Sequence, residues 1–158
     1  MAYKTTGDAS DLPDLFSDLV RCETRLYNAL NDLLRARHGI VTSQFEVLRY
    51  LRDHPRARVA DLAAEFAIGI GATSKSVDRL ERLGWAVRAP NPADRRSSLL
   101  ALTDEGVRLV EAAEETFGAG LAELVGGALD ASSVAAAAHA LAALRSALEG
   151  RGVGMPTG

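Results

Sequence analysis

Residues 77–106, VDRLERLGWAVRAPNPADRRSSLLALTDEG, decide the fold of this chain. Their first part continues a run in which apolar side chains recur every three or four positions, and this predicts a helix over about residues 72–83. The period then changes to two in residues 85–88 and 98–102, and the charged, turn-rich segment 90–97 separates them. This pattern predicts a β-hairpin directly after a helix.

Helical periodicity continues on both sides of this stretch. Apolar steps of three and four predict further helices at residues 11–37, 42–54, 59–66, 104–125 and 131–148. We expect one buried apolar stripe along the first of them and a capping box from Ser43 and Glu46 in the second. Thr103 is expected to cap the helix that follows the hairpin. The predicted fold class is mainly α with a small β-hairpin.

Length and composition restrict the class of protein. The 158 residues are 47% hydrophobic and 25% charged, with a net charge of −3, which fits a globular chain better than a disordered one. No run of about 18 uninterrupted apolar residues occurs and the first residues are polar, so we expect no membrane span, no secretory signal and a cytoplasmic protein. The single cysteine, Cys22, cannot form an internal disulfide and suits a reducing compartment.

The helices at 59–66 and 72–83, with a glycine-containing turn between them, have the order of a helix-turn-helix. The face of the second helix that points away from Val77 and Leu80 is expected to carry short polar and cationic side chains. These are Thr73, Ser74, Lys75, Ser76 and Arg79. Such side chains near the start of a recognition helix contact base edges in the major groove of DNA. A solvated helix face is the simpler alternative, and the helix alone does not decide between them.

The tip of the hairpin favours DNA binding. A two-stranded ribbon tipped by Arg95 and Arg96 after a helix-turn-helix is a winged-helix arrangement, and either arginine can enter a minor groove. Asp94 is expected to organise the loop by pairing with an arginine or capping N–H groups. Residues 49–108 hold eleven Lys and Arg against eight Asp and Glu. The basic excess therefore lies in the part expected to meet phosphates.

These elements divide the chain into four expected segments. They are an N-terminal dimerisation helix (1–40), a winged helix-turn-helix lobe that binds DNA (41–103), C-terminal dimerisation helices (104–150) and a disordered tail (151–158). The terminal helices bury their apolar stripes best against each other and against a second copy, so we expect a homodimer.

Residues 42–106 resemble the MarR (multiple antibiotic resistance regulator) family of transcription factors. The matching stretches are TSQFEVL at 42–48, DLA at 61–63, VDRLERLGW at 77–85, and DRRS at 94–97 followed by LTDEG at 102–106. The resemblance implies a homodimeric repressor on a pseudo-palindromic operator, released by a small phenolic or aromatic-acid ligand. It also implies that Arg96 and Asp94 take the family's wing positions. Arg58 stands where the family often has Ser or Thr as a helix cap, which predicts a less firm start of the helix at 59–66.

The resemblance places the ligand between the terminal helices and the DNA-binding lobe. The candidate lining residues are Tyr27, His38, Phe45, Leu48 and Phe117. Apolar side chains at helical spacing are more often core than pocket, so the core interpretation stays open. No cofactor and no metal are expected, because His38, His54 and His139 lack paired ligand spacing and Cys22 is the only thiol.

The sequence also bears on three other functions, namely a redox sensor, an enzyme and a helical dimerisation module. Cys22 would sense oxidants if it matched a redox-active cysteine of some relatives, but the corresponding positions hold Ser17, Asn31 and Thr42, and a buried structural thiol is favoured. An enzyme is disfavoured because the chain has no glycine-rich phosphate loop, nucleophile elbow or zinc-protease motif. A helical dimerisation module that does not bind DNA would leave the wing arginines without a role.

Overall fold

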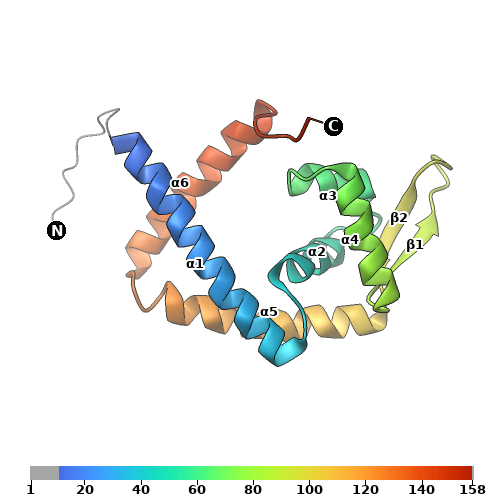
Figure 1. Ribbon diagram of the computed structural model, residues 1–158, viewed down its shortest axis with the longest axis horizontal. Coiled ribbons are helices and arrows are strands. Elements are labelled where there is room, and N and C mark those ends of the chain that lie inside the picture. Colours follow the sequence, from blue (N-terminus) through green and yellow to red (C-terminus); the bar gives the residue numbers. More distant parts are fainter. Residues whose placement is uncertain (1–10, 158) are drawn as a thin grey trace.

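The structure, a computed structural model, describes residues 11–157, which form six α-helices and one antiparallel β-hairpin (Figure 1). The elements are α1 (Leu12–His38), α2 (Thr42–Asp53), α3 (Val59–Glu65), α4 (Ile70–Arg82), β1 (Ala86–Pro90), β2 (Ser98–Leu102), α5 (Asp104–Leu124) and α6 (Ala131–Gly150). Figure 1 shows α2, α3, α4 and the hairpin gathered on one side, which we call the lobe. Helices α1, α5 and α6 form the arm. The predicted class, mainly α with a small hairpin, is confirmed.

The lobe encloses one apolar core. The C-terminal end of α1 and the N-terminal half of α5 also contribute side chains to it. Its fully buried side chains are Leu34, Ile40, Phe45, Leu48, Leu51, Leu62, Val77, Leu80, Leu100 and Val110. Strand β1 pairs with β2 so that Ala86 lies opposite Leu102. The N–H of Leu100 also donates to the carbonyl of Ala57 at 2.7 Å, which joins the segment before α3 to the sheet. The lobe is therefore held together within one chain.

The start of α2 differs from the sequence prediction. The helix begins at Thr42, and the side-chain oxygen of Gln44 accepts a hydrogen bond from the Val41 N–H at 3.0 Å. The predicted capping box of Ser43 and Glu46 is wrong, because both residues already lie inside the helix. A back-capping Gln at the third helical position satisfies the same unpaired donor.

Three short-range contacts join the end of α4, the end of β2 and the start of α5. The Thr103 hydroxyl donates to the carbonyl of Gly84 at 2.6 Å and accepts from the Gly106 N–H at 3.0 Å, so Thr103 is the predicted cap of α5. The Thr103 N–H donates to the carbonyl of Trp85 at 3.1 Å. A Cβ atom on Gly106 would lie 2.1 Å from that same Trp85 oxygen. Only glycine allows this approach of two backbone segments.

Helices α1 and α5 pack closely where they leave the lobe. A Cβ atom on Gly120 of α5 would lie 2.9 Å from a methyl group of Leu33 and 3.0 Å from one of Leu30. Among the α1 residues expected to form a buried stripe, however, only Leu30 and Leu34 are buried, while Leu12 and Phe16 are 61% and 66% exposed. The predicted stripe is wrong for the first half of α1 within a single chain, because no other helix among residues 11–157 covers it.

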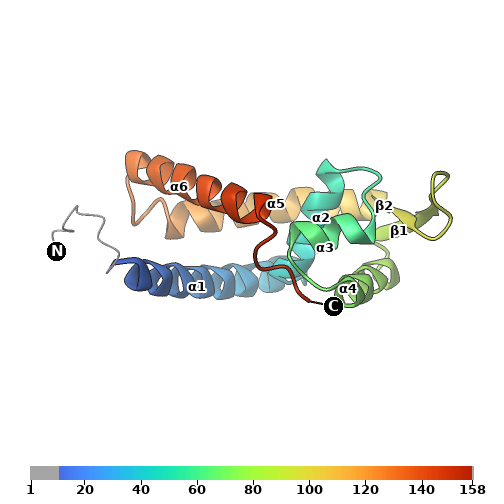
Figure 2. The ribbon, with the colours of Figure 1, turned by 90° about the horizontal axis from the view of Figure 1, so that it is seen from above.

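Helix α6 has no buried residue. Figure 2 shows it running along one side of the arm, with the first half of α1 on the other side. It is the one helix among residues 11–157 that is long and apolar enough to cross a membrane, by length and composition only. After α6 the chain forms hydrogen-bonded turns at residues 151–154, with the Val153 N–H donating to Leu148 at 3.0 Å. The prediction of a disordered tail from residue 151 is wrong for these turns, and residue 158 lies outside the described residues.

Candidate nucleic-acid interface

Helices α3 and α4 form the predicted helix-turn-helix, with the tight turn around Ala67 and Gly69 between them. The Ile68 N–H closes the end of α3 on the Ala63 carbonyl at 3.0 Å, and Ala67 takes a positive φ of 50° in the turn. The inner face of α4 places Val77 and Leu80 in the core with no exposed surface. This packing fixes which side of α4 faces outward.

Thr73 lies on the inner face of α4 and not on the outer one. It is 5% exposed, and its hydroxyl donates to the Gly69 carbonyl at 3.0 Å. The expectation that Thr73 contacts DNA is therefore wrong for this conformation. The physical reason is helical spacing, because Thr73 lies four residues before Val77 and seven before Leu80 and so shares their buried face. Ser74 and Ser76 are half-buried on the two flanks of the helix.

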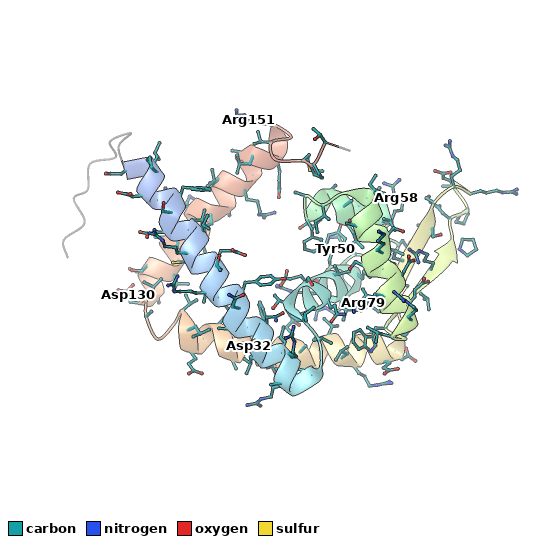
Figure 3. The ribbon with its side chains drawn as sticks, in the orientation of Figure 1. Asp32, Tyr50, Arg58, Arg79, Asp130 and Arg151 are labelled. Atoms are coloured by element: carbon teal, nitrogen blue, oxygen red, sulfur yellow. The ribbon has the colours of Figure 1, made fainter. Side chains whose placement is uncertain are left out.

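The outer face of α4 carries a row of cations. A surface cavity of about 430 Å³ is lined by Lys75, Arg79, Arg82 and Leu83. Figure 3 labels Arg79 on α4. We call Lys75, Arg79 and Arg82 the cationic row. Arg82 is not among the predicted DNA contacts, although its spacing of three from Arg79 and seven from Lys75 places it on the same helix face. A straight row of cations along a helix matches the repeated charge of a phosphate backbone.

The loop of the hairpin, which we call the wing, is preformed by its own hydrogen bonds. The side chain of Asn91 bonds to the Ala93 N–H at 3.0 Å and to the Ser97 hydroxyl at 2.9 Å. Asp94 accepts from the Arg96 N–H at 3.0 Å and pairs with its guanidinium at 3.3 Å, as expected of a loop organiser. The Arg96 side chain is nevertheless 93% exposed, and Arg95 is exposed as well. Both arginines are thus presented outward on an ordered loop.

Arg58 does not weaken the start of α3. The Asp61 carboxylate accepts from the Arg58 N–H at 2.8 Å and from its guanidinium at 2.7 and 3.0 Å. The hydrogen bond from the Arg58 side chain lowers the pKa of the Asp61 carboxyl below its ordinary value. The expectation of a less firm helix start is wrong, because the helix is capped from its third residue instead of its cap residue. Figure 3 shows Arg58 near the outer end of the lobe.

The helix-turn-helix, the cationic row and the exposed wing arginines together form a surface built for a nucleic-acid duplex, and comparison with known proteins identifies the family. The sequence profile of the MarR family matches residues 38–97. The multiple antibiotic resistance protein MarR of Salmonella typhimurium is 31% identical over 104 residues, which are 62% of this chain and 72% of that protein. The chain belongs to the MarR family. Members of this family are transcription regulators that bind DNA and are not enzymes, as the motifs indicated.

Solved structures share the whole arrangement of the arm and the lobe. A mutant of MarR from E. coli complexed with operator DNA has a TM-score of 0.76 and 27% identity, covering 87% of this chain and 99% of that one. The regulator Sco3205 from Streptomyces coelicolor, solved in complex with DNA, has a TM-score of 0.83 at 21% identity and covers 98% of both chains. The predicted winged helix-turn-helix fold of the MarR type is therefore confirmed.

The predicted ligand-lining residues do not share one environment. Phe45 and Leu48 have no exposed surface and belong to the core, whereas Tyr27 on α1 is 39% exposed. Phe117 packs on Phe45 with ring centroids 4.6 Å apart. His38 Nε2 lies 2.8 Å from the Thr116 hydroxyl, which ties the end of α1 to α5. The structure thus brings His38, Phe45 and Phe117 to one junction, and their contact with a ligand stays a prediction.

A buried polar atom at the same junction was missed by sequence reasoning. The hydroxyl oxygen of Thr42 is buried and has no hydrogen-bond partner among residues 11–157, although the N–H of Thr42 donates to Asn31 at 3.1 Å. Burying a hydroxyl without a partner costs on the order of 1–3 kcal/mol. The first turn of α2 therefore contains a hydrogen-bonding group that a bound molecule could satisfy.

Cys22 and the histidines do not gather into a metal site among residues 11–157. Cys22 is exposed on α1, so the expected buried structural thiol is wrong for the single chain. His54 stacks on Tyr50 with centroids 4.1 Å apart and bonds to the Tyr50 carbonyl. Among residues 11–157 no group of three His, Cys, Asp or Glu side chains is arranged to hold a metal ion.

Proposed function

We propose that this protein is a homodimeric transcriptional repressor of the MarR type that binds a palindromic DNA operator in the cytoplasm and is released by a small aromatic or phenolic ligand. The observation that carries the proposal is a helix-turn-helix whose outer α4 face bears the cationic row, followed by a wing with exposed Arg95 and Arg96. In this proposal the row enters a major groove and Arg95 or Arg96 reaches the adjacent minor groove.

The exposed apolar surface of the arm supports the homodimer. Half of α1 and all of α6 present large apolar side chains that the chain itself does not cover. They include Leu12, Leu15, Phe16, Leu141, Leu144 and Leu148. A helix without a polar face is normally buried on several sides, and a second copy offers the same unpaired helices in return. We propose residues 1–40 and 104–150 as the segments that associate.

A dimer also explains how the ligand would act. Two recognition helices enter successive major grooves only when they lie about 34 Å apart. A ligand at the junction of α1, α2 and α5 would lie between the arm and the lobe, and it would reach the buried Thr42 hydroxyl and Phe45 only if this junction opens. It would release DNA to the extent that it binds a different lobe spacing more tightly.

Selection of bound fragments from a pool of random duplexes tests the proposal. A two-fold symmetric winning sequence is expected, with half-sites about one helical turn apart. Light scattering should give twice the mass of the 158-residue chain, and a set of aromatic acids and phenols should be screened for release from the winning duplex. Failure to enrich any sequence would contradict the repressor proposal, and a monomer at micromolar concentration would contradict the dimer.

Exposure of Cys22 on α1 favours a redox-sensing regulator as the second candidate. In that case peroxide would release DNA from the wild-type protein and the Cys22→Ser variant would not respond. A Cys22→Ser variant that keeps the response would remove this candidate.

A further inference from the structure

One charged side chain of the hairpin reaches across to the recognition helix. Arg88 of β1 donates through Nη1 to Asp78 at 2.7 Å and also to the Glu81 carboxylate. Its Nη2 lies 3.4 Å from both the carbonyl and the hydroxyl oxygen of Ser74, and its backbone N–H donates to Glu81 at 3.0 Å. Positions 74, 78 and 81 form one flank of α4, so a single residue of the hairpin contacts this flank over two turns.

The two carboxylates lie next to the cationic row. Asp78 and Glu81 are 52% and 32% exposed, and Asp78 directly precedes Arg79 in the sequence. A carboxylate within about 10 Å of a phosphate repels it, because salt screens charges at a protein surface only beyond that distance. Two uncompensated carboxylates on this helix would therefore offset much of the attraction of three cations for phosphate.

We infer that Arg88 is a positioning and charge-cancelling residue of the recognition helix. It neutralises Asp78 and Glu81 from the side of the hairpin and holds that flank of α4 against β1. The cationic row then meets DNA without a competing negative charge. This inference rests on the proposal that α4 faces DNA, and it assigns to Arg88 a role that requires no contact with DNA.

The geometry separates this role from a direct phosphate contact. The Arg88 side chain is 23% exposed, whereas the side chain of Arg96 in the wing is 93% exposed. Burial lowers the pKa of Arg88, and the hydrogen bonds to Asp78 and Glu81 more than reverse this, so the pKa lies above its ordinary value. Because these acceptors already hold the guanidinium, a phosphate would have to displace them.

A mutant cycle tests the inference. Asp78→Asn and Glu81→Gln remove charge at nearly constant size and keep a side-chain oxygen, whereas Arg88→Gln removes the charge and shortens the side chain but keeps an N–H donor. The set consists of Arg88→Gln, the double variant Asp78→Asn/Glu81→Gln and the triple variant. Their affinity should be measured for two duplexes of about 30 bp, one enriched from a random pool by the wild-type protein and one scrambled. Thermal unfolding of each variant reports folding. The exposed Arg37 at the end of α1 supplies a control, Arg37→Gln, with the same change of net charge.

We expect the effect of Arg88→Gln on DNA affinity to depend on whether Asp78 and Glu81 carry their charges. Arg88→Gln should weaken binding of both duplexes about tenfold or more, and the triple variant should recover to within about threefold of wild type. The double variant and Arg37→Gln should stay within about threefold of wild type. Unchanged affinity in a folded Arg88→Gln variant, or a loss that persists in the triple variant, would overturn the inference.

The cycle remains decisive if Arg88→Gln does not fold. The double and triple variants then differ only by Arg88, in a background without the two carboxylates, and equal affinity is expected. A loss of about tenfold between them would mean that Arg88 binds DNA itself, which contradicts the assigned role. Absence of binding by the wild-type protein to either duplex would overturn the DNA-facing placement of α4 together with the inference.

Discussion

The lobe and the arm differ in how much of their apolar surface a single chain buries. Ten large side chains in the core of the lobe have essentially no exposed surface. They come from α1 and α5 as well as from the helices and the hairpin of the lobe itself. The arm ends in a 20-residue helix with no buried residue. A single chain therefore contains a lobe with a complete apolar core and an arm whose apolar side chains remain exposed. The lobe is thus stabilised by intrachain contacts, and the exposed apolar surface of the arm supports our proposal that the arm associates with a second copy.

Substitution of one leucine in each part gives the largest expected difference. Leu80→Ala removes a fully buried side chain of the lobe and should lower the free energy of unfolding by about 3–4 kcal/mol. Leu144 is 47% exposed in the single chain, so Leu144→Glu should act chiefly on association and raise the dimer dissociation constant by about 100-fold or more. Denaturant unfolding and sedimentation equilibrium measure the two effects. A Leu144→Glu variant that stays dimeric would break the comparison.

The junction between the two parts should be the next most sensitive position. Gly106→Ala forces a Cβ atom against the Trp85 backbone oxygen, and neither backbone segment can move freely. A loss of about 2–3 kcal/mol of unfolding free energy is expected. Gly118→Ala is the matched control, because its Cβ would meet no atom within 4 Å, and it should be neutral or stabilising by about 0.5–1 kcal/mol. Equal effects of the two substitutions would show that the junction tolerates a side chain.

Charge removal on the DNA-facing surface should leave folding unchanged and affect only binding. Arg96→Ala in the wing should weaken operator binding about tenfold and lower the slope of log affinity against log salt by about 0.9. Lys75→Ala on α4 should change the preference among operator variants more than the affinity for scrambled DNA. Fluorescence anisotropy at several salt concentrations measures both. Unchanged affinity of Arg96→Ala at two salt concentrations would remove the wing from the interface.

The smallest effect is expected at the ion pair between the lobe and the arm. Arg52 of α2 binds Glu114 of α5 through two hydrogen bonds, one of them 3.1 Å long, and these lower the pKa of Glu114 below its ordinary 4.5. A lowered folded pKa means that the stabilisation is present above about pH 4.5 and disappears as the pH falls through the folded value. Because Glu114 is 40% exposed, Glu114→Gln should cost no more than about 1 kcal/mol at pH 7.

Thermal unfolding of Glu114→Gln and wild type between pH 3 and 7 checks this sign, where the two proteins should converge at the acidic end. A difference that grows as the pH falls would contradict it. Together these four experiments separate intrachain stability, association, DNA binding and the link between the lobe and the arm.

Sequence alone predicts the parts of this fold that depend on local patterns. The change of period after Gly84 located the hairpin, and the adjacent arginines located the wing. The predicted stripe of α1 is wrong before Leu30, because periodicity shows that a face is apolar but not which chain covers it. The predicted outward position of Thr73 is wrong, although its spacing of four from Val77 and seven from Leu80 places it on their buried face of α4.

Local sequence patterns do not predict contacts between residues that are far apart in the chain. Arg88 meets Asp78 only because the hairpin folds back along α4, ten positions later in the chain. The Thr42 hydroxyl is a candidate ligand contact only because its surroundings leave it unpaired, which no local motif records. Arg82 could have been found, since it continues the face of Lys75 and Arg79 at helical spacing.

The close approach of Gly106 to Trp85 gives α5 the mechanical character of a rigid lever. Its 21 residues span about 30 Å without interruption, from the end of the recognition helix to the packing against α1. With the lobe end clamped, a tilt of about 5° at the other end displaces the attached lobe by roughly 3 Å, about half the pitch of a helical turn. A small tilt of α5 in the arm would therefore displace α4 by an amount comparable to half a helical turn.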